Sequence, residues 1–306
     1  MKAIRIPAPE FDLEKTLNSG QVFHWERLKS GFVGTIDERA VCVEQRGDTL
    51  RVAFGEAPAL PEIVSRYFAL DHSLPEICAS FPQDAPMQAA REFCRGLRII
   101  RQPKWECLAT FICSSMKQVA HIRQISRNLR ERFGEERKID NWSVFAFPSA
   151  QRIARRSEAQ LRACALGYRA KNLLATARLV TRGDVDLEQI STLPDEELRA
   201  VLCGLPGVGA KVANCVMLFA YERLRAFPID VWIERVLREQ YFRRKRKVTA
   251  LRLRDFTQSY FGEHGGYAQQ YLFHYARLKS GRDAALRRPR TAQGAVPTSD
   301  KRRPLR

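Results

Sequence analysis

The chain has 306 residues, of which 45% are hydrophobic and 28% are charged, a composition typical of a soluble globular protein with one large or two modest domains. Its 52 Lys and Arg residues outnumber its 34 Asp and Glu residues, and the formal net charge of +18 indicates a polyanionic partner. The start MKAIRIPAPEF lacks the apolar run of a signal peptide, and no stretch has transmembrane length, so we expect an intracellular protein without membrane association.

The cysteines and histidines argue against two further classes of protein. The eight cysteines are spread singly without a Cys-x-x-Cys pair, and the five histidines show no metal-ligand spacing. The sequence therefore predicts neither a zinc site nor a disulfide framework, and it favours a reduced compartment.

The first part of the chain has the pattern of a small antiparallel sheet. Between residues 10 and 54, runs that alternate apolar and polar residues are separated by turns such as Lys-Ser-Gly and Arg-Gly-Asp. This spacing predicts strands that are joined by hairpins and buried on one face. The predicted strands are 21–28, 31–36, 40–45 and 49–54.

From about residue 61 the apolar residues recur at helical spacing, nearly to Leu278. Pro103 opens a largely apolar helix that we expect in the core, and Gly134 is the expected left-handed residue after another helix. The predicted helices are 61–70, 86–99, 105–113, 117–133, 157–166, 170–182 and one that starts at Pro194.

These patterns predict an α+β protein with two domains. The first domain, residues 1–84, contains the small antiparallel β-sheet, and the second, residues 85–280, is mainly helical. Residues 281–306 are rich in Arg, Pro, Gly and Ala and offer little to bury, so we expect a disordered basic tail.

The most informative stretch runs from Leu202 to Val236, LCGLPGVGAKVANCVMLFAYERLRAFPIDVWIERV. It predicts two helices joined by a tight Leu-Pro-Gly-Val-Gly turn, followed by a loop and a third helix. Gly207 and Gly209 are expected to adopt positive φ. The free N–H groups at the start of the second helix then face outward, ready to bind a phosphate.

This stretch resembles the helix-hairpin-helix plus Gly-Pro-Asp element of the base-excision DNA glycosylases, in which a helical hairpin grips a DNA backbone. The resemblance implies that Lys211 is an amine nucleophile and that Asp230 is the carboxylate that assists it. It also assigns DNA contacts to the turn residues Gly207, Val208 and Gly209.

The wider chain, over roughly residues 8–280, looks like an 8-oxoguanine DNA glycosylase/AP lyase of the HhH-GPD superfamily. The segments that carry this resemblance are Leu17–Trp25, Arg101–Ser115 and Leu166–Ala170. It implies that the backbone carbonyl of Gly20 accepts a hydrogen bond from the lesion. The nitrogen N7 of guanine is a hydrogen-bond acceptor, whereas in 8-oxoguanine it carries a hydrogen and donates. A carbonyl at this point therefore discriminates between the two bases.

The resemblance also implies a pocket for a base that has been rotated out of the duplex. Cys215 follows Lys211 by four residues, and Phe273 follows Gln269 by four, so each pair shares one helix face. In this pocket Phe273 stacks on the base, Gln269 hydrogen-bonds its pairing edge, and Cys215 forms a wall.

Several expected DNA contacts follow from the same resemblance, although some positions depart from the family pattern. Tyr168 belongs to the group that wedges the duplex open. Met116 stands where an asparagine run fills the vacated space, and His121 stands where an arginine reads the opposite cytosine. Trp232 replaces a histidine that contacts a phosphate. These changes leave the opposite-base preference open.

The resemblance therefore implies a bifunctional enzyme that removes 8-oxoguanine from duplex DNA through an imine between Lys211 and the sugar. We expect a monomer that binds DNA largely through phosphates and needs no metal or organic cofactor for the chemistry. The carbonyls of Cys203, Leu205 and Val208 are candidates to hold a monovalent cation.

Two alternatives stay open at this stage. A monofunctional glycosylase for 3-methyladenine-type bases shares the fold, but such enzymes generally lack the lysine. A DNA-binding module could use the hairpin without any chemistry. The iron–sulfur members of the superfamily are excluded, because the last cysteine of the chain is Cys215, inside the hairpin.

Overall fold

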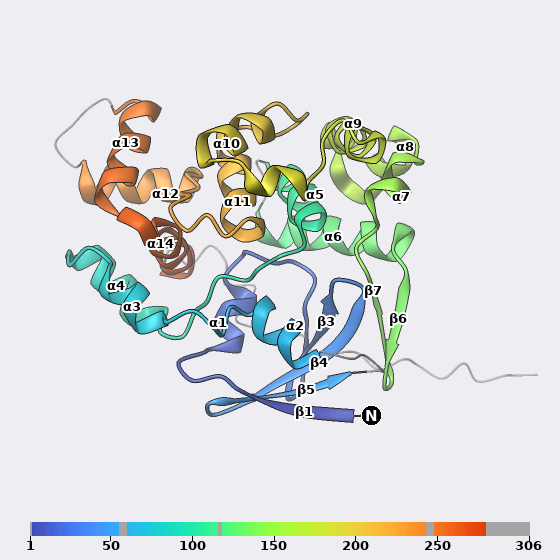
Figure 1. Ribbon diagram of the computed structural model, residues 1–306, viewed down its shortest axis with the longest axis horizontal. Helices are drawn as coiled ribbons and strands as arrows, with labels where there is room; N and C mark the ends of the chain where they lie inside the picture. The colour runs from blue at the N-terminus through green and yellow to red at the C-terminus, as the bar shows by residue number, and fades with distance from the viewer. Residues whose placement is uncertain (1, 55–59, 116–117, 243–247, 280–306) are drawn as a thin grey trace, which may run out of the picture.

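The computed structural model describes residues 2–54, 60–115, 118–242 and 248–279. Figure 1 shows a sheet with two short helices beneath a larger helical body. The predicted α+β class is confirmed. The predicted tail, residues 281–306, and Met116 lie outside the described residues. Across the described ranges, no helix combines the length and the apolar character needed to cross a membrane.

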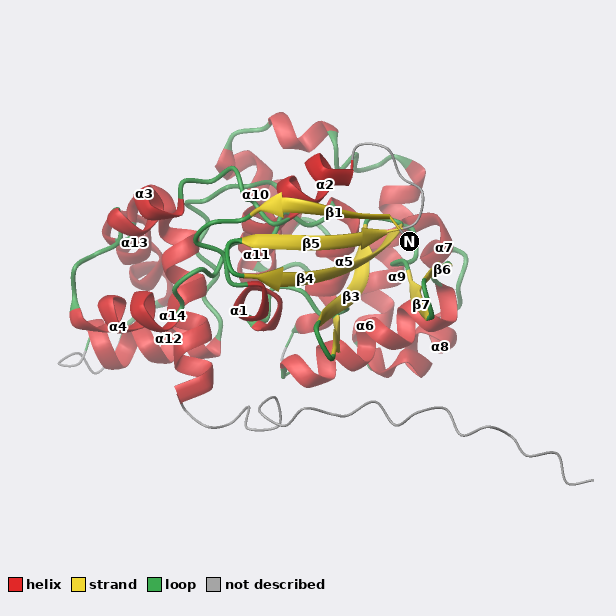
Figure 2. Cartoon of the chain, turned by 90° about the horizontal axis from the view of Figure 1, so that it is seen from below, coloured by secondary structure: helices red, strands yellow, loops and turns green. Residues whose placement is uncertain are grey.

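The sheet is antiparallel with the strand order β1-β5-β4-β3-β2, and β1, β5 and β4 lie side by side in Figure 2. The predicted strands 31–36 and 49–54 are confirmed, whereas β1 was missed and pairs with β5 along its whole length. The strands are β1 (Lys2–Pro7), β2 (Glu26–Leu28), β3 (Gly31–Ile36), β4 (Arg39–Arg46) and β5 (Thr49–Phe54).

The predicted strand 21–28 forms only at its end, because Gln21 turns its side chain inward. Its amide donates to the carbonyl of Arg98 at 2.9 Å and accepts from the backbone N–H of Ile100 at 2.8 Å. These bonds satisfy a buried polar group and fix the turn before β2 against a distant segment. Two helices, α1 (Leu13–Asn18) and α2 (Leu60–Tyr67), accompany the sheet, and α1 was also missed.

The helical body surrounds α5 (Lys104–Ser114), which is buried from Cys107 to Ser114 as predicted. The predicted helix 86–99 ends at Phe93, where the chain becomes irregular. The remaining helices are α3 (Leu74–Ala79), α4 (Ala85–Phe93), α6 (Val119–Phe133), α7 (Ala150–Ala154), α8 (Glu158–Leu161), α9 (Arg169–Arg182), α10 (Asp195–Cys203), α11 (Ala210–Ala220), α12 (Val231–Val236), α13 (Ala250–Tyr260) and α14 (Gly265–Lys279).

A small hairpin, β6 (Glu136–Ile139) and β7 (Trp142–Phe145), interrupts the body where only helices were predicted. Gly134, just before it, has φ −77° and ψ 174°, so the expected left-handed conformation is wrong. A side chain at Gly134 would collide with the carbonyl oxygens of Ala146 and Arg130. Glycine is therefore required for close backbone approach and not for an unusual φ.

Two apolar clusters form the interior. One contains buried residues of the sheet, α1 and α2, and the other contains residues of the helices from α3 onward. The domain boundary between residues 84 and 85 stays a prediction.

The start of α14 generates a stability prediction, because its two glycines have different surroundings. A Cβ on Gly266 would overlap Leu218 and lie 2.9 Å from the carbonyl oxygens of Leu224 and Ala226, whereas one on Gly265 would meet only ordinary contacts. We expect Gly266→Ala to lower the free energy of unfolding by about 2 kcal/mol. Gly265→Ala, the matched control, should be neutral or stabilise by about 0.5 kcal/mol. Urea unfolding of both variants tests this, and equal losses would contradict it.

Candidate active site

The hairpin between α10 and α11 presents the start of α11 to the surface. Gly207 has φ +83°, as predicted, and the neighbouring Pro206 carbonyl accepts from the Thr176 hydroxyl of α9 at 3.0 Å. Gly209 has φ −96° and ψ −179°, so its predicted positive φ is wrong. It is the extended N-cap of α11, a position that leaves the first N–H groups of that helix without helical acceptors.

The turn is open on one side and packed on the other. A Cβ built on Gly209 would meet no atom within 4 Å. Val208 is 6% exposed, and its N–H donates to the Leu205 carbonyl at 3.1 Å. The side chain of Val208 therefore belongs to the core, so only its backbone is available to a ligand at this turn.

Lys211 lies in the first turn of α11 and is held by the end of α5. Its ammonium donates to the hydroxyl of Ser114 at 3.1 Å and lies 5.1 Å from the centroid of the Phe111 ring. The Ser114 hydroxyl in turn donates to the Phe111 carbonyl at 2.7 Å. Ser114 therefore offers a lone pair to Lys211, and the lysine is directed by two residues of one neighbouring helix.

Asp230 is half-buried at the N-terminus of α12. Its carboxylate accepts from the backbone N–H groups of Ile233 at 2.9 Å and Trp232 at 3.1 Å. Burial raises the pKa of Asp230 above its ordinary value, and these two hydrogen bonds and the charge of Lys211 oppose that rise. The structure thus brings Lys211 and Asp230 within electrostatic range.

Cys215 belongs to the same group of side chains. Burial raises the pKa of its thiol to about 11, although Lys211 acts in the opposite direction. At neutral pH Cys215 is therefore an uncharged thiol, one helical turn from the lysine. In the described part of the chain, no three His, Cys, Asp or Glu side chains are grouped so that they could bind a metal ion.

The three other predicted pocket residues are Gln269 and Phe273 of α14 and Gly20 in the turn between α1 and β2, which α14 approaches. Gly20 has φ +87°, and a Cβ there would lie 3.1 Å from the Phe273 ring. Gln269, one turn earlier on α14, is 4% exposed, and its Oε1 atom has no hydrogen-bond partner among the described residues. A buried acceptor without a partner indicates a site that a ligand donor can fill.

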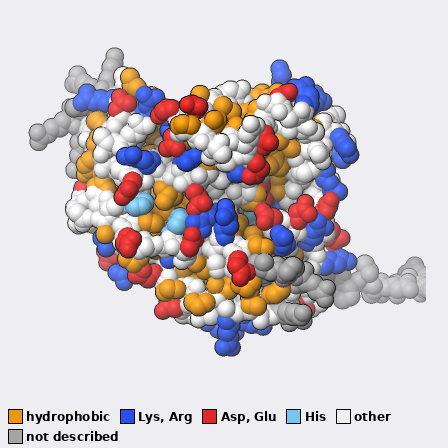
Figure 3. Space-filling view, viewed as in Figure 1, with side chains coloured by type: hydrophobic (Ala, Val, Ile, Leu, Met, Phe, Trp, Pro, Cys, Tyr) orange, Lys and Arg blue, Asp and Glu red, His pale blue; other side chains and the backbone are white. Residues whose placement is uncertain are grey.

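The residues expected to contact DNA are mostly accessible. Tyr168 is 56% exposed and lies 4.3 Å below the guanidinium of Arg169. His121 is exposed on the first turn of α6. Trp232 is half-buried, with the guanidinium of Arg235 at 5.6 Å from its ring. On the face shown in Figure 3, Lys and Arg are interspersed with Asp and Glu, so the positive charge is not gathered into one patch there.

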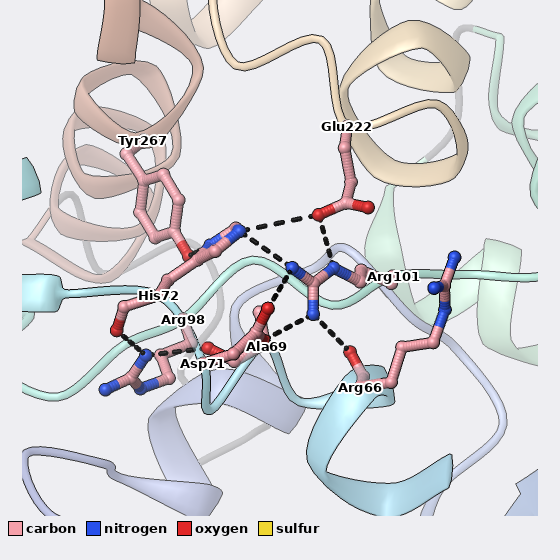
Figure 4. Close-up of polar contacts among 8 residues, drawn as sticks. All are labelled: Arg66, Ala69, Asp71, His72, Arg98, Arg101, Glu222 and Tyr267. Atoms are coloured by element: carbon pink, nitrogen blue, oxygen red, sulfur yellow. Dashed lines mark hydrogen bonds and ion pairs between the residues drawn. The ribbon is translucent and has the colours of Figure 1, made fainter. Parts of the chain in front are cut away.

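A polar network that the sequence did not reveal connects the start of α14 to the rest of the molecule (Figure 4). Arg101 bonds Asp71 at 2.5 and 2.9 Å, the Arg66 carbonyl at 3.1 Å, and the carboxylate of Glu222. His72 contacts Arg101 at 2.9 Å and the Tyr267 hydroxyl at 3.0 Å. Tyr267 lies two residues before Gln269, so the network holds the helix that carries the predicted pocket residues Gln269 and Phe273.

Comparisons with known proteins agree with this geometry. Residues 3–108 match the family model of the 8-oxoguanine DNA glycosylase N-terminal domain. Residues 109–258 match that of the HhH-GPD superfamily of base excision DNA repair proteins. The N-glycosylase/DNA lyase OGG1 of Arabidopsis thaliana is 30% identical over 88% of this chain and 78% of that protein. The chain belongs to the 8-oxoguanine DNA glycosylase family.

Two further members extend the likeness over nearly the whole chain. A probable N-glycosylase/DNA lyase of Methanothermobacter thermautotrophicus is 28% identical over 90% of this chain and 96% of that one. A crystal structure of the Clostridium acetobutylicum 8-oxoguanine glycosylase/lyase, bound to DNA with cytosine opposite 8-oxoG, has a TM-score of 0.84 and 31% identity. That comparison covers 88% of this chain and 93% of the Clostridium chain.

The hydrogen bond between Lys211 and Ser114 was not predicted from the sequence. The two residues are 97 positions apart, and no local pattern connects them. The available signal was the pair Ser114-Ser115 at the end of a largely apolar helix. A buried hydroxyl at such a position needs a hydrogen-bond partner, which indicates a polar group nearby.

The two glycines of the hairpin give a matched pair for a stability test. A Cβ on Gly207 would lie 2.8 Å from the Cβ of Asn172, at a φ of +83°. We expect Gly207→Ala to cost about 1–2 kcal/mol of unfolding free energy. Gly209→Ala has neither problem and should stay within about 0.5 kcal/mol of the parent. Thermal unfolding measures both, and a fully stable Gly207→Ala protein would contradict the described turn.

Proposed function

We propose that this protein is a bifunctional DNA glycosylase/AP lyase that excises 8-oxoguanine and related oxidised purines from duplex DNA in base-excision repair. The observation that carries this proposal is the placement of Lys211 at the start of α11, bonded to Ser114 and within electrostatic range of Asp230. An amine at this point, beside a carboxylate, suits attack on a sugar carbon. The names of the relatives support the same activity.

In the proposed reaction, the neutral amine of Lys211 forms a bond to C1′ of the sugar as the bond from C1′ to the base breaks. The leaving base takes up a proton. Asp230 stabilises the positive charge that develops on the sugar in this step. Opening of the sugar ring gives an imine between Lys211 and C1′, and loss of a C2′ proton then expels the 3′ phosphate. This last step is the lyase reaction.

The pocket would recognise a guanine-type base through Gln269 and select its oxidised form through the carbonyl of Gly20. The carbonyl of Gly20 accepts from N7–H of 8-oxoguanine and repels the lone pair at N7 of guanine. Oε1 of Gln269, buried without a partner among the described residues, accepts from the pairing edge. Phe273 stacks on the base and Cys215 forms the opposite wall. Leaving one buried acceptor unpaired costs about 1–3 kcal/mol, which disfavours the normal base.

The surrounding residues would hold the DNA. The backbone of Gly207, Val208 and Gly209 and the start of α11 bind a phosphate, and Tyr168 wedges the duplex. Of the others, Trp232 lies beside a phosphate and His121 faces the opposite strand, while Met116, outside the described residues, is assigned to the vacated space by the resemblance alone. The partner is damaged duplex DNA bound by a monomer inside the cell, in the nucleoid and cytoplasm of a bacterium or in a nucleus.

The first test is borohydride trapping on a duplex with one 8-oxoguanine. The parent protein should give a covalent adduct and Lys211→Gln none, because only an imine is reduced to a stable bond. Lys138→Gln, which removes an exposed lysine on β6, is the matched control and should trap like the parent.

Other results of this test would assign the chain elsewhere. An adduct that persists in Lys211→Gln would remove Lys211 as the nucleophile. Excision of an alkylated base without an adduct would indicate a monofunctional glycosylase. Binding without either would indicate a DNA-binding module. The trapping is then repeated with each of the four bases opposite the lesion. The amount of adduct on each duplex measures how strictly an enzyme with Met116 and His121 at these positions requires cytosine opposite the lesion.

The raised pKa of Asp230 gives a pH prediction. Because the carboxylate is needed ionised, single-turnover excision should fall as the pH drops through a pKa above the ordinary aspartate value. Asp230→Asn should lose the inflection that this carboxyl group causes in the pH profile, and it should slow excision at neutral pH on the order of a hundredfold. Cys215→Ser should keep the limb, since its thiol titrates far higher. An acid limb that survives in Asp230→Asn would assign the titration to another group.

A further inference from the structure

The helix α14 grips the turn that carries Gly20 through successive backbone carbonyls. Arg277 donates to the carbonyl of Asn18 at 2.6 Å, and Gln270 donates to the carbonyl of Ser19 at 3.1 Å. Among the described residues, no hydrogen bond is made to the next carbonyl, that of Gly20. The helix therefore fixes the two carbonyls before Gly20 and leaves the third available.

Arg277 makes the closest approach to this turn. Its side chain is 1% exposed, and its Nη1 atom occupies the space that a Cβ on Gly20 would need. Its guanidinium carbon lies 5.3 Å from the centroid of the Phe273 ring. One planar group thus contacts both sides of the proposed slot, the carbonyl-bearing turn and the stacking ring.

We propose that Arg277 is a positioning residue that determines lesion specificity, because it sets the place of the Gly20 carbonyl relative to the Phe273 ring. This inference rests on the proposed function, in which that carbonyl reads N7–H of 8-oxoguanine. A guanidinium suits the task, since its rigid fork can bond one carbonyl while its flat face packs against neighbours. Small displacements of a reading group weaken discrimination strongly.

The turn is also braced from the opposite direction. The side-chain oxygen of Asn18 accepts from Arg123 of α6 at 3.0 Å, while its backbone carbonyl accepts from Arg277. Asn18 is therefore held between α6 and α14, and of these two contacts only that of Arg277 is made to the backbone that leads to Gly20. Lys211, in contrast, is directed by α5. The group that reads the base and the group that attacks the sugar have separate supports.

This separation defines the experiment. Arg277→Met and Arg277→Lys are compared on a duplex with 8-oxoguanine and on one with an abasic site, which needs Lys211 but no base pocket. We expect Arg277→Met to excise 8-oxoguanine on the order of tenfold more slowly while cleaving the abasic site at the parent rate. Arg277→Lys, which keeps one donor for the Asn18 carbonyl, should fall between. Lys279→Met removes an exposed charge from the same helix and should match the parent.

A modified base makes the test specific to the Gly20 carbonyl. 7-Deaza-8-oxoguanine has carbon in place of N7–H and cannot donate there. The parent should process it more slowly than 8-oxoguanine, and Arg277→Met should cause little additional loss on this base, since the two changes remove the same interaction. Three results would each overturn the proposal. Arg277→Met could slow excision and abasic-site cleavage equally, or it could leave the rate of 8-oxoguanine excision unchanged. It could also slow excision of 7-deaza-8-oxoguanine by the same factor as excision of 8-oxoguanine. A parent protein that cannot trap an abasic site would instead overturn the proposed function.

Discussion

The attachment of α14 to the turn at residues 18–20 is the constraint on which the rest of the site depends. This helix bonds the turn through Gln270 and Arg277, and at its start the N–H of Gly266 donates to the Leu224 carbonyl at 2.7 Å. Gly266 also lies close against Leu218 of α11, the helix whose first turn carries Lys211. One helix therefore contacts both the turn of the proposed base pocket and the helix that carries Lys211, and Gly266 permits the close approach of α14 to α11.

The ionised carboxylate of Asp230 lowers the stability of the folded protein. The half-buried Asp230 has a raised pKa, which means that the folded chain holds its carboxylate less favourably than the unfolded chain does. Asp230 therefore contributes most to the free energy of unfolding when its carboxyl group is protonated. This contribution is lost as the pH rises through the raised pKa of Asp230. Two backbone N–H groups of α12 and the charge of Lys211 limit the cost. A carboxylate kept under such conditions is typical of a functional group.

Local patterns predicted the elements with strong periodicity, such as α5, β3 and β5, and the hairpin that holds Lys211. The family resemblance named the pocket residues. The features that could not be predicted from the sequence depend on contacts between segments that are far apart in the chain. Gln21 ends a predicted strand because its amide bonds the segment near Arg98, and Ser114 meets Lys211 only in the folded chain. Gly134 was misread because close approach and positive φ select the same residue in a sequence.

The pocket has a consequence for how the protein is made. Gln270 and Ser19, which bond each other, are separated by 251 positions in the chain. The hairpin, Lys211 and Asp230 are all synthesised before α14 emerges. Under the proposed chemistry, a chain that stopped short of Gly265 would contain the lysine and the carboxylate but lack Gln269 and Phe273. Under that proposal, selectivity for the damaged base is the last property that the growing chain acquires, after the residues assigned to DNA cleavage are already present.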